Sequence, residues 1–307
     1  MSFCDAIKIT PGGLALRQSQ NQEPPMTEPV SVEIFTVGNE ILTGEIQDTN
    51  TCWLCREFNH LGVRVARCTV LRDDLRVIAL ELRAALARGT RMILTSGGLG
   101  PTADDLTLAA VAEGAGVPLL LHEEALRMVR QSYDDLHDRG ILEVGGLNPA
   151  REKMAHLPAG ASPLANPVGT APGVLLQLGK TAVVSLPGVP PELHGIFHSS
   201  LQPFLRQTFQ GGLSALHTLT VCCNDESLLE PLLSRVVPAH PEVYIKSLAT
   251  RPGEMAELDI FLTATGSDRA AVQSLIDAAL KDLREGLGAL DISHRDKLDA
   301  FARKQKE

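Results

Sequence analysis

Long apolar runs and an excess of positive charge are both missing from this sequence. No run approaches the roughly 20 apolar residues that a membrane-spanning helix needs, and the first 29 residues lack the apolar core of a secretory signal. Lys and Arg number 28 against 37 Asp and Glu, which gives a formal net charge of −9. Because a nucleic-acid-binding surface is basic, we do not expect nucleic acid as a partner, although a small anion could still bind locally. Because no apolar run is long enough, we do not expect a membrane as a partner either.

Cysteine is also scarce, with six residues at irregular spacing. In a chain of this size the pattern indicates reduced thiols, and we expect a cytoplasmic protein. The 307 residues suffice for one large domain and a smaller second one. Residues 1–29 are rich in Gln, Pro and Gly, so we expect a disordered leader, and Met26 is a candidate natural start.

Short apolar strands and amphipathic helices alternate from residue 30 onward. This pattern predicts strands over 30–38, 63–71 and 91–96, and helices over 49–60, 74–88 and 103–116. Such alternation implies an α/β fold with a parallel sheet covered on both faces, and ligands of such sheets lie beyond the carboxyl ends of the strands. The segments VGNEILTG and SGGLGPTADD both follow strands, so we expect them to face one site.

The second half of the chain has a different pattern. The first expected domain, 30–210, closes with a hairpin that turns at Gly179–Lys180 and a helix that begins at two prolines. Gly211–Gly212 marks a boundary. Beyond it we expect the order strand, helix, strand, strand, helix, which is a small α+β domain over 213–290, and then a charged tail over 291–307.

Three glycines, Gly97, Gly98 and Gly100, crowd the turn after the third expected strand. Glycine permits a positive φ and a close approach of backbone to ligand, and the helix expected next offers free N–H groups to an anion. The turn therefore suits a phosphate. It fits a non-catalytic nucleotide- or pterin-binding module as well as an enzyme.

Two aspartates follow this turn, and two interpretations stay open. In one, Asp104 and Asp105 complement the dipole of the next helix, with Thr102 as its cap and Asp105 as the capping-box partner. In the other, a divalent metal bridges the carboxylates and a phosphate, because both supply hard oxygen ligands. Near the first strand, Glu40 is a candidate assistant, and Asn50 is a ligand candidate if its amide faces the crevice rather than capping a helix.

The chain resembles the amino-terminal half of the competence/damage-inducible protein A (CinA) family in five ordered blocks: VGNEILTGEIQDTN, GVRVARCTVLRDD, TSGGLGPTADDLT, NPVGTAPG and LPGVPPEL. The resemblance covers about residues 32–209 and implies a three-layer α/β/α fold of the molybdopterin-binding type. That half is also similar to a domain attached to eukaryotic FAD synthase. From about residue 213 to 288 the chain resembles the family's KH-like domain, although CCNDES replaces a glycine-rich stretch there.

In some relatives this domain hydrolyses a nucleotide pyrophosphate such as ADP-ribose or FAD, so the resemblance implies release of AMP with Mg²⁺, Mn²⁺ or Co²⁺ as cofactor. The implied catalytic residues are Asp105, Asp104 and Glu40, and the metal ligands are Asp105 and Asp104. The implied ligand-binding residues are Gly38, Asn50, Gly97, Gly98, Gly100, Thr102, Asn166, Gly169, Thr170, Pro187, Gly188 and Glu192. We expect a small-molecule nucleotide or pterin as partner, with molybdopterin as one possible ligand, and a homo-oligomer, either dimer or trimer.

The chain departs from the family in two respects. Many members carry a carboxy-terminal amidase domain acting on nicotinamide mononucleotide, and only a short tail follows the second domain here, so we do not expect that activity. Molybdenum-insertion relatives typically have Arg–Asp where this chain has Asp104–Asp105. An anion in place of a cation favours phosphate binding through a metal, and therefore hydrolysis over a transferase step in molybdenum cofactor assembly.

Two further motifs point to other chemistry. Cys52 and Cys55 have the C-x-x-C spacing of redox and zinc sites, but they lie inside an expected helix and no second pair completes a zinc site. His194 and His198 are four residues apart on an expected helix and could bind a metal together, although no third ligand is evident.

Overall fold

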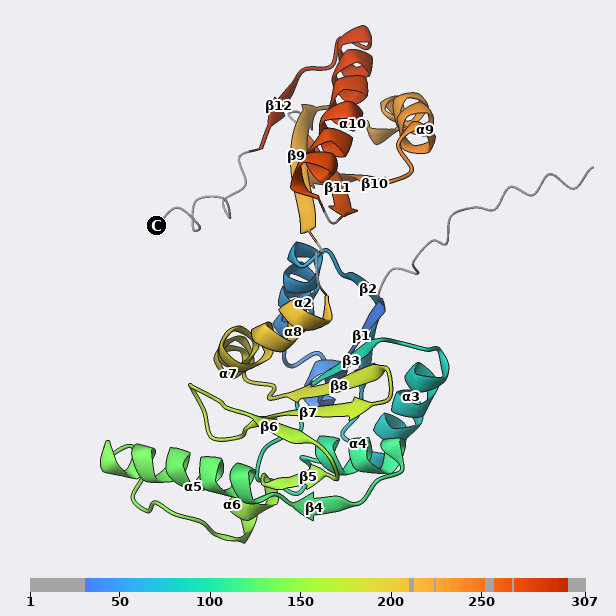
Figure 1. The fold of residues 1–307 in the computed structure, drawn as a ribbon. Helices are drawn as coiled ribbons and strands as arrows, with labels where there is room; N and C mark the ends of the chain where they lie inside the picture. The colour runs from blue at the N-terminus through green and yellow to red at the C-terminus, as the bar shows by residue number, and fades with distance from the viewer. Residues whose placement is uncertain (1–30, 210–212, 224, 252–256, 267, 298–307) are drawn as a thin grey trace, which may run out of the picture.

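The structure is a computed structural model that describes residues 31–209, 213–223, 225–251, 257–266 and 268–297. The expected leader with Met26, the boundary at Gly211–Gly212 and residues 298–307 of the expected tail lie outside the described residues. Two sheets form the centres of two units (Figure 1), with two hydrophobic clusters in the first unit and one in the second. Within the described ranges, no helix combines the length and apolar character that crossing a membrane requires.

A six-stranded sheet lies at the centre of the first unit. Its strands are β1 (Ser31–Val37), β2 (Arg64–Leu71), β3 (Met92–Ser96), β6 (Ser162–Leu164), β7 (Gly173–Leu178) and β8 (Thr181–Leu186). Their order across the sheet is β2-β1-β3-β8-β7-β6. The first four are parallel, whereas β7 and β6 run antiparallel to their neighbours. The predicted α/β fold with a mostly parallel sheet is confirmed.

Helices cover both faces of this sheet because successive side chains of each strand point to opposite faces. On β1, Ile34 belongs to the core formed with Leu54 and Phe58, whereas Phe35 belongs to the core formed with Ile78. The helices of the first core are α2 (Thr49–His60), α7 (Pro190–Ile196) and α8 (Gln202–Thr208), and those of the second are α3 (Leu75–Ala87), α4 (Thr107–Ala115) and α5 (Glu123–Asp138). The result is the three-layer arrangement that the family resemblance implied.

Short elements complete this unit. They are α1 (Asn39–Leu42), α6 (Pro149–Lys153), the π-helical turn η1 (Phe197–Leu201) and a two-stranded sheet of β4 (Leu119–Leu121) and β5 (His156–Pro158). Figure 1 shows α5, α6 and this small sheet together at the lower end of the unit.

Most predicted boundaries in the first unit agree with the structure to within a residue or two, but one does not. Helix α4 begins at Thr107, whereas the sequence pattern predicted a helix from residue 103. The hydroxyl of Thr107 donates to the Gly97 carbonyl at 2.8 Å, and its N–H donates to the Gly98 carbonyl at 3.2 Å. These bonds tie the start of the helix back to the glycine turn, so residues 101–106 remain outside it.

The second unit has the predicted order of strand, helix, strand, strand and helix, with one addition. Its elements are β9 (Leu213–Cys222), the 3₁₀ turn η2 (Glu226–Leu228), α9 (Glu230–Ala239), β10 (Val243–Arg251), β11 (Glu257–Gly266), α10 (Arg269–Ala289) and β12 (His294–Asp296). The sheet order is β10-β11-β9-β12, with antiparallel pairing throughout. The charged tail expected from residue 291 thus begins with a short strand, which a 2.5 Å ion pair from Lys297 to the buried Asp259 anchors.

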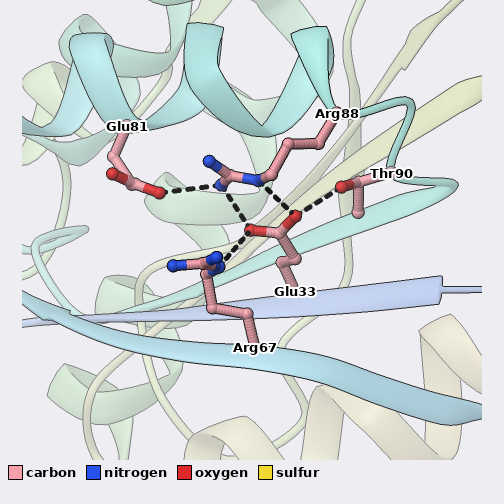
Figure 2. Close-up of polar contacts among 5 residues, drawn as sticks. All are labelled: Glu33, Arg67, Glu81, Arg88 and Thr90. Atoms are coloured by element: carbon pink, nitrogen blue, oxygen red, sulfur yellow. Dashed lines mark hydrogen bonds and ion pairs between the residues drawn. The ribbon is translucent and has the colours of Figure 1, made fainter.

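A buried carboxylate lies near the amino-terminal end of β1, at the edge of the sheet opposite to where the parallel strands end. Figure 2 shows Glu33 facing Arg88 and Thr90, which follow α3. Arg88 forms two hydrogen bonds to its carboxylate, at 2.9 and 2.6 Å, and Thr90 forms a third at 2.5 Å. Arg67 on β2 lies 3.9 Å away, and Glu81 binds the same Arg88 at 2.8 Å. The charge of Glu33 is therefore fully paired.

Candidate functional site

A crevice of about 570 Å³ opens where the parallel strands end. Glu40 follows β1, Asp73 follows β2, Gly97 follows β3 and Gly188 follows β8, and all four line the crevice. The carboxyl ends of parallel strands meet at one edge of a sheet, so four segments distant in sequence converge there. A crevice of this size accommodates a ligand as large as a nucleotide.

Glycine is required at two positions of the turn after β3. Gly97 has φ 106°, and a Cβ there would lie 2.2 Å from the carbonyl oxygen of Val37. Gly98 has φ 69°, and a Cβ there would lie 2.2 Å from the Thr107 hydroxyl. The N–H of Gly97 already donates to Leu186 at 3.0 Å. In the part of the chain that the structure describes, no group accepts from the N–H of Gly98 or Gly100, which leaves both for a ligand.

The aspartates after the turn do not belong to the helix. α4 has no acidic residue in its first turn, and its N-cap, Leu106, makes no side-chain capping bond. The predicted role of Thr102 as the cap of α4 is therefore wrong, and both aspartates lie ahead of its N-cap, Leu106. Instead, Asp105 accepts from the N–H of Thr102 at 2.8 Å, and the single hydroxyl proton of Thr102 is shared between Asp105, at 2.6 Å, and Asp104.

A lysine that the sequence reasoning missed holds this turn from outside. The ammonium group of Lys153, at the end of α6, donates to the carbonyl of Thr102. Asp104 is fully exposed, and the hydrogen bond from Thr102, aided by the charge of Lys153, lowers the pKa of Asp104. Asp104 is therefore ionised at neutral pH and available to a cation.

Asp73 is the main functional candidate that the sequence reasoning missed. Its carboxylate accepts from the N–H of Asn39 at 2.7 Å, which holds the loop after β2 against α1. Burial raises the pKa of Asp73, and the charges of Glu40 and Asp104 raise it further, against the lowering effect of the Asn39 bond. The carboxylates of Glu40, on α1, and of Asp104 thus repel the carboxylate of Asp73. The available signal was the position of Asp73 directly after a strand, within the block GVRVARCTVLRDD.

The crevice is strongly acidic. Six carboxylate residues line it, namely Glu40, Asp48, Asp73, Asp104, Asp105 and Glu192, whereas no lysine or arginine is among the described residues that do so. In the described ranges, no group of three or more His, Cys, Asp or Glu side chains is arranged to hold a metal by itself. An anionic ligand would therefore need a cation that binds the ligand and the carboxylates together.

Asn50 faces the crevice, which was the condition for a role in ligand binding. Its amide donates to the Gly188 carbonyl at 2.7 Å and to the Ser96 hydroxyl at 3.1 Å, and its buried Oδ1 has no partner within the described residues. The helix cap is Asp48, which accepts from the N–H of Thr51 at 2.9 Å. Asn50 thus joins the last residue of β3 to the loop after β8 instead of capping α2.

The loop around Asn166 forms the far wall of the site. Asn166 donates to Glu192 at 2.7 Å and accepts from the N–H of Gly169 at 2.8 Å. A Cβ on Gly169 would lie 2.1 Å from the Glu192 carboxyl group, so the loop packs directly on this acid. Burial raises the pKa of Glu192, although the bond from Asn166 opposes that shift.

Most of the residues predicted for the site converge on the crevice. Those that line it are Glu40, Asn50, Gly97, Gly98, Gly100, Asp104, Asp105, Thr170, Pro187, Gly188 and Glu192. The other four, Gly38, Thr102, Asn166 and Gly169, do not line it but each contacts a residue that does.

The histidine pair lies in a different environment. Trp53 of α2 stacks on His194 with ring centroids 4.0 Å apart, and its ring meets that of His198 edge-on at 5.4 Å. Burial and the neighbouring His198 lower the pKa of His194. The two histidines pack against an aromatic ring, and the third ligand that a metal site needs is missing from the described residues.

Known proteins resemble this chain over the whole first unit. Residues 33–207 match the family described as a probable molybdopterin binding domain. A protein of Pyrobaculum arsenaticum is 41% identical over 214 residues, which are 70% of this chain and 78% of that protein. A protein of Aeropyrum pernix is 38% identical over 260 residues, covering 84% of this chain and 93% of that protein.

A solved structure of a CinA protein is similar to this chain in both sequence and fold. The protein CinA from Thermoplasma acidophilum, described as having unknown function, is 36% identical and has a TM-score of 0.51. The match covers 57% of this chain and 98% of that one. The CinA-like character of the first unit is thereby confirmed, whereas the likeness of the second unit to a KH domain, the likeness to FAD synthase and the expected homo-oligomer stay predictions.

Proposed function

Since this chain belongs to the family of probable molybdopterin binding domains, we propose that its crevice binds a phosphate-bearing nucleotide through a divalent metal and hydrolyses its pyrophosphate link. The observation that carries this proposal is the acidic lining next to a turn suited to phosphate. Six carboxylate residues line the same crevice as Gly98 and Gly100, whose N–H groups have no acceptor among the described residues. A binder of a bare anion gains nothing from such acids, because they repel the ligand.

The carboxylates fit a metal whose coordination the substrate completes. Mg²⁺ is commonly held by one or two carboxylates together with substrate phosphates and water, so a preformed group of three ligands is not required. Asp104 and Asp105 are the ligands we assign, with Mg²⁺, Mn²⁺ or Co²⁺ as the metal. A bound cation would neutralise phosphate charge and polarise the phosphoryl oxygen. It would also relieve the repulsion that Glu40 and Asp104 exert on Asp73.

The remaining groups of the site have distinct tasks. The N–H groups of Gly98 and Gly100 stabilise charge that develops on the phosphate oxygens. Glu40 or Asp73 positions a water molecule and accepts its proton. The water oxygen bonds to phosphorus while the bridging P–O bond breaks, so that ADP-ribose or FAD yields AMP and a second phosphomonoester. Thr102 and Lys153 act indirectly, because they hold the turn that carries the aspartates.

The experiment is an assay, with Mg²⁺, Mn²⁺ or Co²⁺, for release of AMP from ADP-ribose, FAD and NADH and of adenosine 3′,5′-bisphosphate from coenzyme A. We expect metal-dependent AMP from at least one substrate, and a loss of roughly 100-fold or more in Asp105→Asn, as for other changes that remove a group stabilising transition-state charge. Asparagine keeps one oxygen that can accept from the Thr102 N–H, so the variant should have the same melting temperature as the wild type.

Asp135→Asn is the matched control, because Asp135 is an exposed aspartate on α5 that does not line the crevice. It should retain full activity. Equal activity in Asp105→Asn and in the wild type would overturn the assignment of Asp105.

A second candidate is a non-catalytic module that binds molybdopterin, or a transferase step in molybdenum cofactor assembly. The description of the family favours a pterin ligand. Calorimetry with molybdopterin and with nucleotides, in the presence of each metal, separates the two candidates. Tight pterin binding without AMP release from any substrate would support the second candidate and contradict hydrolysis.

A further inference from the structure

Two cysteine side chains from different elements meet on the surface of the first unit. Cys55 lies in the second turn of α2 and Cys68 lies on β2, and their sulfur atoms are 3.7 Å apart. Cys68 is exposed and Cys55 is partly exposed. The C-x-x-C spacing had drawn attention to Cys52 and Cys55, but the structure places Cys55 against Cys68, thirteen residues further along the chain.

We propose that Cys55 and Cys68 form a reversible disulfide, with low-molecular-weight disulfides of the glutathione class as the oxidant. An S–S bond is about 2 Å long, so closure moves the two sulfur atoms together by less than about 2 Å. The two side chains lie on α2 and β2, which already pack together, and rotation about the Cα–Cβ bonds can move the sulfur atoms by this distance. The pair thus forms an oxidation site separate from the chemistry of the crevice.

The two thiols have different roles in the exchange. The hydrogen bond from Cys55 lowers the pKa of Cys68, against burial and the charge of Asp48. The same hydrogen bond, together with burial, raises the pKa of Cys55. Because the thiolate is the nucleophile, the more exposed Cys68 attacks first.

The exchange then proceeds in two balanced steps. The Cys68 thiolate attacks one sulfur of the oxidised disulfide, forms a mixed disulfide and releases one thiolate. Cys55 then gives up its proton to water, attacks the sulfur of Cys68 and releases the second thiolate. Two protein thiols are oxidised, and one small disulfide is reduced to two thiols.

The bond would strengthen a weak edge of the fold. β2 is the terminal strand of the sheet and pairs there with β1. A link from β2 to α2 adds a second attachment and closes a short loop, which restricts the unfolded chain. The first residues of α2 line the crevice, so the link would also restrain this part of the site. We therefore expect the oxidised protein to melt several degrees above the reduced one.

The experiment equilibrates the full chain in glutathione buffers from reducing to oxidising, traps free thiols with a maleimide and maps the products by mass spectrometry. Trypsin releases Cys68 in the peptide CTVLR, residues 68–72, and releases Cys52 and Cys55 together in the peptide that ends at Arg56, so fragmentation of the linked peptides is needed to assign the bond to Cys55. Cys52→Ser is the matched control, because Cys52 lies one turn before Cys55 and is exposed. It should form the Cys55–Cys68 bond as readily as the wild type.

The single variants test the order of attack. In Cys55→Ser we expect a glutathione adduct that accumulates on Cys68. In Cys68→Ser we expect Cys55 to react at least several-fold more slowly than Cys68 does in Cys55→Ser. A Cys52–Cys55 bond in place of the proposed one, or free Cys55 and Cys68 in a buffer that oxidises an unstructured dithiol peptide, would overturn the proposal. A melting temperature that falls on oxidation would overturn the stabilising role of the bond.

Discussion

Acidic side chains occupy both ends of the parallel strands, and their surroundings are opposite. Near the amino-terminal end, Glu33 is 3% exposed, yet Arg88 and Thr90 satisfy both of its carboxylate oxygens (Figure 2). At the carboxyl end, Asp73 has an N–H partner, but its charged neighbours are the acids Glu40 and Asp104.

The pKa shifts follow this difference. Burial alone would raise the pKa of Glu33, but the hydrogen bonds from Arg88 and Thr90 and the charge of Arg88 lower it overall. The pKa of Asp73 is raised by burial and by like charges. Paired acids at one end stabilise the fold, and repelling acids at the other end cost stability. A pKa that stays raised by like charges in spite of the Asn39 N–H bond is typical of a site that awaits a cation.

The largest effect on the fold should come from the turn at the carboxyl end. In Gly97→Ala the new Cβ would lie 2.2 Å from a backbone oxygen, and φ 106° is strained for alanine. We expect a loss of about 3 kcal/mol or more in the free energy of unfolding, measured by urea denaturation. Gly116→Ala is the control, because Gly116 has φ 70° but open space around its Cβ position. It should cost about 1 kcal/mol, and similar losses in the two variants would show that strain, rather than the close contact, matters.

Removal of the paired acid at the other end should have the next largest effect. We expect Glu33→Gln to lower the free energy of unfolding at pH 7 by about 2–3 kcal/mol. This is less than the roughly 3–5 kcal/mol for breaking a fully buried pair, because Arg88 is partly exposed and keeps Glu81. Catalysis by the folded variant should be unchanged. Glu81→Gln, the matched control at the rim, should cost less than about 1 kcal/mol.

The pH dependence of stability should also distinguish Glu33→Gln from the wild type. Because the pKa of folded Glu33 lies below its ordinary value of 4.5, its contribution is present above that value and is lost as the pH falls through the folded-state pKa. Urea denaturation between pH 7 and pH 3 should therefore show a smaller acid-side loss in Glu33→Gln than in the wild type. Parallel curves for the two proteins would contradict the pairing.

The smallest effect, of opposite sign, should come from Asp73→Asn. A folded-state pKa above the ordinary value means that the charged form opposes folding at neutral pH, and that this cost disappears as the pH falls. Without metal we expect the variant to melt roughly 1–3 °C above the wild type, while metal-dependent activity falls. The metal should also raise the melting temperature of the variant less than that of the wild type. A variant less stable than the wild type at pH 7 would contradict the repulsion.

Much of the local structure could be predicted because its causes lie close together in the chain. Helix α2 spans the predicted residues, since apolar periodicity and the Asp48 cap define it within one turn. The hairpin of β7 and β8 turns at Gly179, whose φ of 57° suits glycine. Convergence of the loops at Glu40 and Gly97 followed from parallel strands, whose carboxyl ends meet at one edge.

Other features depend on residues that are brought together only by folding. The sequence by itself determined the α/β alternation, the phosphate-suited turn and the acids that follow it, because these rest on local periodicity and residue type. The tertiary structure decided that α4 begins at Thr107, that Asp73 joins the crevice and that Cys55 meets Cys68 rather than Cys52. It also decided which acids are paired, since Glu33 and Arg88 are 55 residues apart in the chain. Side-chain contacts across such separations depend on the packing of whole elements, which no local pattern records.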